Sequence, residues 1–168
     1  MASTDGIVVE IILDPDSPFQ GQGLVGVFKS VMFDNMQQAQ VTIQAKWPID
    51  TSRSFRAWST LDESKKSQIL IVLLNDAFEA RPKGAKYYPK YVRRKGELAA
   101  GKPPILDQPS EGGVVYEVDK AVKRIMSTFN GDESKKDDPT WAVNRRLVAL
   151  MQRALATGDV AGAVALRK

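Results

Sequence analysis

Three glycines near the N-terminus form the first pattern whose spacing could do chemistry. Gly21, Gly23 and Gly26 make the string G-x-G-x-x-G, which in dinucleotide-binding proteins cradles a pyrophosphate at the start of a helix. Such a site needs a strand directly before the glycines and an acidic residue about twenty residues later, after a second strand. Here Pro15 and Pro18 interrupt the approach, and no acidic residue ends a second strand at that distance. The string therefore does not predict a nucleotide site. A small enzyme of an unrecognised type is a hypothesis that rests on this string alone.

The side chains on which most enzymes depend are missing from this chain. It contains no Cys and no His, which excludes thiolate nucleophiles, disulfides, Cys-based zinc sites and imidazole as a general base. The acidic residues are scattered over loops, so no pair suggests a two-carboxylate mechanism or a cation cage. A Walker-type loop with its lysine is also absent from the sequence. We therefore expect a protein without enzymatic activity, without a cofactor and without a bound metal.

A basic segment rich in tyrosine is the strongest candidate for a binding surface. Three tyrosines are followed directly by three cations: Tyr87, Tyr88, Tyr91, Arg93, Arg94 and Lys95. In one interpretation the rings pack on a neighbouring hairpin while the charges are solvated. In the other the segment contacts a protein or phosphate groups, because aromatic rings beside Arg and Lys suit both. The formal net charge of +4 permits contact with a polyanion without demanding it.

No segment is long and apolar enough to cross a membrane, and the N-terminal residues lack the basic and apolar regions of a signal peptide. From these features we expect a product that is cytoplasmic or assembled in the cytoplasm.

A strand and a long helix are the first elements expected to position this segment. Residues 6–13 are β-branched and bounded by Asp5 and Asp14, which predicts a strand. From Phe19 to Lys46 the pattern has a helical period, with apolar side chains every three or four positions, which predicts a helix with one stripe facing the core. Gly21, Gly23 and Gly26 weaken its first turns, so the start is expected near Leu24. The stripe consists of Leu24, Phe28, Val31, Met32, Met36, Ala39 and Ile43. Pro48 ends this helix because proline cannot continue the hydrogen-bond ladder.

The stretch that follows predicts a short helical turn from Ser52 to about Ala57 and then an antiparallel hairpin. Its strands are expected at 56–61 and 67–75, and the apolar run in the second strand predicts burial on both faces or nearly so. We expect a loop at 79–84 and a short helix around 87–91. The fold class expected is α+β: a small antiparallel sheet, made of the hairpin and the N-terminal strand, packed by a long amphipathic helix.

The rest of the chain predicts an arm and a helical extension. Residues 97–113 are rich in Pro and Gly and predict an exposed arm, 114–116 a short strand, and 117–129 an amphipathic helix with Arg124 on its polar side. The charged stretch at 130–138 predicts a boundary. We therefore expect an α+β domain at 1–131 and a charged linker with a C-terminal helical tail at 132–168.

The tail predicts one helix from Thr140 to about Thr157 and a last helix at 160–167, with apolar faces that the tail cannot bury alone. It either folds back on the domain or docks onto a neighbouring subunit. In the second case the contact residues are Trp141, Leu147, Met151 and Leu155. We predict that truncation after Gly131 leaves the first domain folded and weakens assembly.

The stretch from Trp47 to Gly96 resembles a recurrent pattern of tailed-bacteriophage proteins, the small tail-completion or neck family. In that family a helix is followed by Pro-Val/Ile-Asp-Thr-Gly-x-Leu-x-x-Ser, then a hairpin, then Tyr-Ala-x-Tyr-Val-Glu-x-Gly. The residues that match are Pro48, Ile49, Asp50, Thr51, Tyr88, Tyr91, Val92 and Gly96. The chain departs from the pattern at Ser52, Phe55 and Arg93, where Gly, Leu and Glu are usual, and the arm and the tail lie outside it.

The resemblance implies a structural virion protein that forms part of a ring joining the head connector to the tail, assembled in the host cytoplasm. Its partners would be copies of itself in a cyclic homo-oligomer and the neighbouring head-connector and tail proteins, with no membrane. Arg93, Arg94 and Lys95 are candidates for contact with DNA in the channel or with a neighbouring subunit, and a solvated outer face is the alternative. The alternative function is a small basic nucleic-acid-binding module without catalytic activity.

Overall fold

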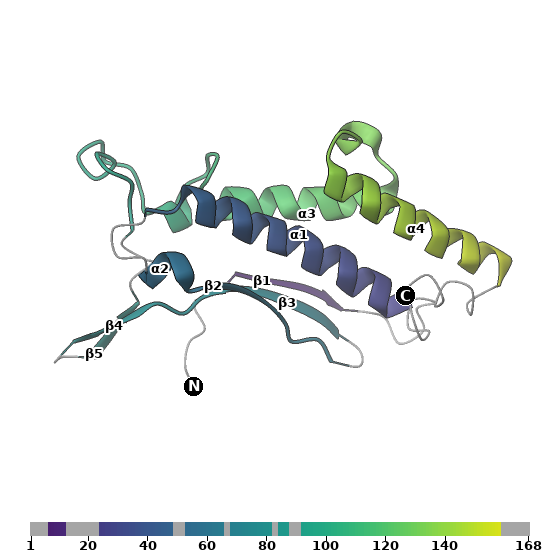
Figure 1. Ribbon diagram of the computed structural model, residues 1–168, viewed down its shortest axis with the longest axis horizontal. Coiled ribbons are helices and arrows are strands. Elements are labelled where there is room, and N and C mark those ends of the chain that lie inside the picture. The colour runs from purple at the N-terminus through teal and green to yellow at the C-terminus, as the bar shows by residue number, and fades with distance from the viewer. Residues whose placement is uncertain are drawn as a thin grey trace. The chain divides into compact units, whose positions relative to one another are not determined.

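The computed structural model describes residues 7–12, 24–48, 53–65, 68–81, 84–87 and 92–158. In chain order the elements are β1 (Ile7–Ile12), α1 (Leu24–Lys46), α2 (Arg53–Arg56), β2 (Trp58–Asp62), β3 (Gln68–Asn75), β4 (Phe78–Arg81), β5 (Gly84–Tyr87), η3 (Ile105–Asp107), α3 (Val114–Asn130), η4 (Glu133–Lys135) and α4 (Pro139–Thr157) (Figure 1). The α+β class expected from the sequence is confirmed.

The described residues cluster into two compact units that do not follow the predicted boundary at residue 131. The first contains residues 36–61 and 72–121, and the second contains residues 8–12, 24–35, 62–71 and 122–158. Each unit is therefore assembled from separate stretches of chain, and α1, β3 and α3 each contribute to both.

Three strands form one sheet in the order β1-β3-β2, so the N-terminal strand joins the hairpin as predicted and β3 is central. The hairpin continues into its turn through an antiparallel bridge between Lys65 and Gln68. Along β3, Ile69, Ile71 and Leu73 are fully buried, and the residues between them are half-buried or buried. The alternation places one face of β3 in the core and leaves the other largely covered, which confirms the burial predicted for this apolar run.

Helix α1 begins at Leu24 and ends at Lys46, as predicted. Of its stripe, Val31, Met32, Met36 and Ile43 are wholly inaccessible to solvent and Ala39 is buried. Phe28 is half-buried, and the Leu24 side chain lies outside the described part. In the first unit a glutamine beside the stripe fastens the helix to the hairpin. The Gln40 amide donates to the Trp58 carbonyl at 3.0 Å, and its oxygen accepts from the Thr60 hydroxyl at 2.7 Å.

The loop predicted at 79–84 is wrong, because β4 and β5 pair there as a two-stranded antiparallel sheet. The register places Glu79 opposite Lys86 and Phe78 opposite Tyr87. Pro82 and Gly84 indicate a loop by their residue types, but Gly84 begins β5 and pairs with Arg81 of β4. Tyr87 ends a strand, so the predicted helix does not begin there, and residues 88–91 lie outside the described part.

The short strand predicted at 114–116 is also wrong, because these residues form the first turn of α3. The Glu117 carboxylate accepts a hydrogen bond from the Gly112 amide at 2.9 Å, and the Glu117 amide donates to the Gly113 carbonyl at 3.0 Å. A buried carboxylate that satisfies an amide at the helix start stabilises that end of the helix. This capping outweighs the preference of Val114 and Val115 for strands.

In the second unit α4 folds back, which is one of the two alternatives left open for the tail. Trp141 and Met151 are buried, and the Trp141 indole N–H donates to the Ser127 hydroxyl of α3 at 2.9 Å. These two residues are therefore core and not the subunit contact expected from the sequence. Leu147 is half-buried, while the Leu155 side chain and the helix predicted at 160–167 lie outside the described part.

Arg124 of α3 was expected on the polar side of its helix and is instead buried. Its Nε lies 2.8 Å from an Asp138 carboxylate oxygen, and one terminal nitrogen donates to the Asn35 side-chain oxygen of α1 at 3.4 Å. In the same unit the rings of Phe28 of α1 and Phe129 of α3 stack with centroids 4.4 Å apart. The second unit is thus joined by an internal charge pair as well as by apolar packing.

Candidate interaction site

A loop in the first unit connects the basic segment to α3, and its ends are joined. The Ile105 amide donates to the Val92 carbonyl at 2.9 Å, which closes the loop at its base. Residues 96–103, called the loop tip below, are held by further backbone bonds, among them one from the Ala100 amide to the Gly96 carbonyl at 3.1 Å. Gly96 has φ +82°, a left-handed conformation that glycine adopts without strain. The tip is thus an ordered turn.

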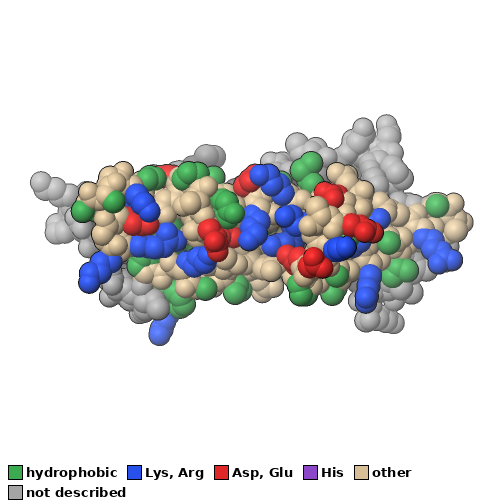
Figure 2. Space-filling view, turned by 90° about the horizontal axis from the view of Figure 1, so that it is seen from above, with side chains coloured by type: hydrophobic (Ala, Val, Ile, Leu, Met, Phe, Trp, Pro, Cys, Tyr) green, Lys and Arg blue, Asp and Glu red, His purple; other side chains and the backbone are tan. Residues whose placement is uncertain are grey.

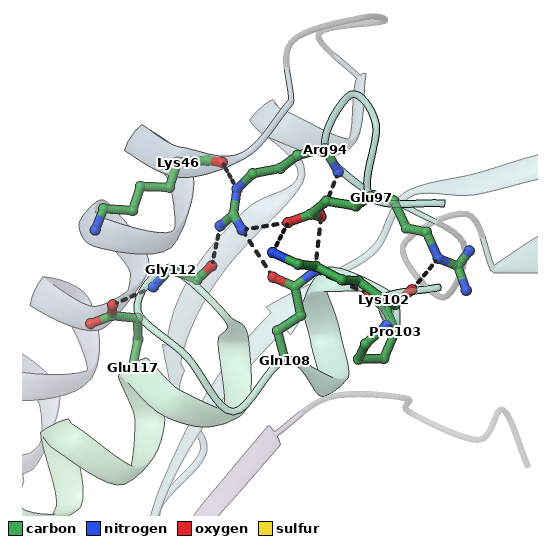
Figure 3. Close-up of polar contacts among 9 residues, drawn as sticks. Lys46, Arg94, Glu97, Lys102, Pro103, Gln108, Gly112 and Glu117 are labelled. Atoms are coloured by element: carbon green, nitrogen blue, oxygen red, sulfur yellow. Dashed lines mark hydrogen bonds and ion pairs between the residues drawn. The ribbon is translucent and has the colours of Figure 1, made fainter. Parts of the chain in front are cut away.

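The guanidinium of Arg94 lies at the centre of the site and binds four separate points of the chain (Figure 3). It donates to the carbonyls of Lys46, at the end of α1, and of Gly112, before α3, at 3.4 and 3.0 Å. It also donates to the Gln108 side-chain oxygen at 2.9 Å and to Glu97 at 3.3 Å. All three of its nitrogens are used, so Arg94 holds the loop base against two helix ends. We call Arg94, Glu97 and Gln108 the Arg94 cluster.

Glu97 supplies the negative charge of the cluster and is almost fully covered, with its side chain 11% exposed. It accepts from the Arg94 backbone amide at 2.9 Å and from the Gln108 amide at 2.8 Å. Burial by itself raises the pKa of Glu97, but these hydrogen bonds and the Arg94 charge together lower it below its ordinary value of 4.5. A carboxylate held in its ionised form in this way serves to fix structure and is a poor general acid.

The Arg94 cluster predicts a measurable dependence of stability on pH. Because the pKa of Glu97 is lower in the folded than in the unfolded chain, its contribution is fully present above about pH 4.5 and is lost as the pH falls through the folded pKa. The difference in unfolding free energy between the wild type and Glu97→Gln should therefore shrink on acidification, measured by urea denaturation between pH 7 and 3. Arg94→Met should destabilise by about 2 to 3 kcal/mol at pH 7, because it leaves the covered Glu97 carboxylate with only the exposed Lys102 ammonium, 4.0 Å away, as a charge partner. A wild-type advantage over Glu97→Gln that is constant with pH would contradict this assignment.

The close packing at the base of the loop leaves no room for side chains at two glycines. A Cβ on Gly113 would lie 2.0 Å from the Gln108 carbonyl oxygen, and one on Gly112 would lie 2.6 Å from an Arg94 nitrogen. Gly112 also has φ +82°. The Gly-Gly pair therefore allows the chain to pass close to the cluster before α3 begins.

The loop tip carries an exposed apolar side chain among cations. Leu98 is 72% exposed, and Lys95 and Lys102 beside it are exposed as well. Arg93 is half-buried and donates from its Nε to the Lys102 carbonyl at 3.0 Å. The one acidic residue of the tip, Glu97, points into the cluster, so the tip offers an apolar side chain with positive charge around it. Such a combination suits contact with another macromolecule.

The three cations predicted for a DNA or subunit contact have different environments in the structure. Arg94 is engaged inside the fold, so it is an anchor of the loop. Arg93 is partly engaged, and Lys95 is exposed. The sequence signal for this division is weak: Arg94 and Glu97 are three residues apart, a common spacing for ion pairs, but nothing in the sequence indicated Gln108.

Of the first part of the motif, only Pro48 belongs to the described residues, and it lies at the corner that follows α1. Pro48 is half-buried just after α1, whereas residues 49–51 are outside the described part. Of the second part, Val92 is buried and Gly96 opens the loop tip, while Tyr88 and Tyr91 are also not described. Gly26, the last residue of the glycine string, lies within α1.

Polar contacts around this corner tie α1 to the hairpin in the first unit. The Trp47 indole N–H donates to the Ser54 hydroxyl at 2.9 Å, and the Asn75 amide donates to the Ser54 carbonyl at 2.7 Å. The rings of Trp47 and Trp58 meet edge to face, with centroids 5.2 Å apart. A buried tryptophan pair and a buried serine therefore set the geometry of the corner.

Comparison with protein-family models, with curated proteins and with solved structures returned no match to this chain. Within the described ranges no group of acidic side chains is arranged to hold a metal ion. None of the described helices is both long and apolar enough to cross a membrane.

Proposed function

We propose that this protein is a structural component of a tailed-phage virion, a tail-completion or neck protein that forms part of the ring joining head connector and tail. The order of elements supports this proposal, because α1, the Pro48 corner and the hairpin follow one another as in the family pattern that the sequence resembles. Its partners in that role are copies of itself and the adjoining connector and tail proteins.

One observation carries the proposal. Gly96, the last residue of the second motif, is the point where the chain turns into the loop tip, and two residues later Leu98 is presented to solvent. Hydrogen bonds within the Arg94 cluster fix the loop tip in one conformation. An exposed leucine that is already held in place has less conformational entropy to lose when it binds a partner surface. A cyclic head-to-tail assembly needs such a feature on every subunit.

The proposal predicts that the purified full-length chain forms a ring of defined mass by native mass spectrometry and negative-stain imaging. Leu98→Asp should shift the mass toward the monomer, because a charge replaces the apolar tip. It should leave the unfolding free energy within about 0.5 kcal/mol, since the residue is exposed. Val41→Asp is the matched control, because Val41 is also exposed, at 59%, and lies on α1. A lone monomer at every concentration, together with absence of the chain from purified virions, would exclude the ring.

A small nucleic-acid-binding module is the second candidate, favoured by two exposed lysines, Lys95 just before the loop tip and Lys102 within it. It requires a monomeric chain whose affinity for short DNA falls steeply with salt and falls further on replacing both lysines by alanine. Arg94 is unsuitable for that test, because its loss would disturb the loop base.

A further inference from the structure

Helix α4 has a second face that the described fold leaves open. The residues at spacings of three and four along this face are all exposed: Pro139, Val143, Arg146, Leu150, Arg153 and Thr157. Val143 is 65% exposed and Leu150 is 41% exposed. Because α4 buries Trp141 and Met151 on the other side, its two faces are distinct. We call Val143, Arg146, Leu150 and Arg153 the α4 stripe.

The charge on α4 has one sign. The helix runs from Pro139 to Thr157 without an Asp or a Glu, and its charged residues are three arginines. Two of them are in the α4 stripe, each three residues after an exposed apolar side chain, so each apolar position has a cation one turn further on. In the space-filling view apolar and basic side chains lie together over the end of α4 (Figure 2).

We propose that the α4 stripe binds an acidic amphipathic helix of another protein. Apolar residues seven apart on an exposed helix match the spacing by which amphipathic helices recognise each other. Carboxylates on the partner would pair with Arg146 and Arg153, whereas a second α4 packed on the stripe would bring arginine against arginine. Charge complementarity therefore selects an acidic partner over a copy of the same helix. This proposal does not depend on the ring, because it uses a different surface from the loop tip.

The experiment uses the full-length chain and two synthetic helical peptides as probes. The first peptide has leucine at the seam positions and glutamate beside them, and the second has lysine in place of every glutamate. Binding is followed by fluorescence anisotropy at low and physiological salt. We expect the acidic peptide to bind on the order of tenfold or more tightly than the basic one. Val143→Ser with Leu150→Ser should abolish that binding, while Val41→Ser, an equally exposed change on α1, should leave it intact.

Reversal of the charges gives the sharper result. Arg146→Glu with Arg153→Glu should invert the preference toward the basic peptide, which a loss of folding cannot do. Equal binding of both peptides, or acidic-peptide binding that survives the double serine change, would overturn the proposal. One further result would overturn the proposal: the wild type binds neither peptide, and the mass of the ring falls in the double serine variant. A second copy of the chain would then cover the α4 stripe.

Discussion

A chain that ends at Gly131 is expected to lose the cooperative unfolding of its second unit. The truncation removes α4, whose Trp141, Val148 and Met151 are buried, and exposes the surface of the second unit against which they pack, including the part of α3 around Ser127. From the sequence, folding back and docking on a neighbour are both open for the tail, and truncation after Gly131 is predicted to leave the first domain folded. The buried side chains of α4 lead instead to an expected loss of structure in the second unit. The measurement is thermal and urea unfolding of the truncated chain beside the full-length chain.

Trp141→Ala isolates the same effect in a single residue. The side chain fills buried space and its indole N–H is bonded to Ser127, so the expected loss is about 3 to 5 kcal/mol of unfolding free energy. Val143→Ala in the same helix is the control and should cost less than about 1 kcal/mol, because Val143 is exposed. A truncated chain that unfolds cooperatively at an unchanged midpoint would show instead that the tail contributes nothing to the core.

Replacing Arg124 by methionine is expected to lower the unfolding free energy by about 3 to 5 kcal/mol, because it leaves a carboxylate without its charge partner. Both carboxylate oxygens of Asp138 have partners. One lies 2.8 Å from Arg124, and the other accepts from the Thr140 and Trp141 amides at 2.9 and 3.2 Å and so caps α4. Loss of the pair therefore affects both the charge balance of the second unit and the start of its last helix.

Two substitutions at Asp138 separate these roles. Asp138→Asn keeps an oxygen for the cap and removes the charge, whereas Asp138→Ala removes both and should cost about 1 kcal/mol more. Combined with Arg124→Met, Asp138→Asn should cost less than the sum of the two single changes, because the double variant leaves neither charge unpaired. Lys120→Met, which removes an exposed cation from the same helix, is the control. Arg124 and Asp138 would not be energetically coupled if Arg124→Met cost as little as that control. The same would follow if the free-energy change of the double variant equalled the sum of the two single changes.

The parts of the fold that could be predicted from the sequence are those in which one periodic pattern dominates. The apolar stripe of α1 and the apolar run of β3 each satisfy a single period, so their type and bounds followed from spacing. The predictions for 79–84 and 114–116 are wrong, because two short strands pair with each other in the first case and a buried carboxylate caps a helix in the second. Both depend on contacts that local propensity does not contain.

The candidate site was less predictable, because a sequence displays charges without their partners. The sequence indicates surface cations at Arg94 and Arg124, whereas both side chains are bonded inside the fold. Their partners are distant: Gln108 is 14 positions from Arg94, and Asn35 is 89 positions from Arg124. The expectation of an exposed arm at 97–113 describes the loop tip, where Leu98 is open to solvent, but Ile105 and Gln108 are buried at its base.

The separation of 89 positions between Asn35 and Arg124 has a consequence for biosynthesis. Helix α1 leaves the ribosome long before α3 and α4 have been translated, by an interval on the order of ten seconds at ordinary elongation rates. During that interval Asn35 and the other residues of α1 that are buried in the second unit remain exposed to water, because the segments that cover them do not yet exist. The second unit can therefore close only after α3 and α4 have emerged, which makes it the later of the two events in the folding of a new subunit.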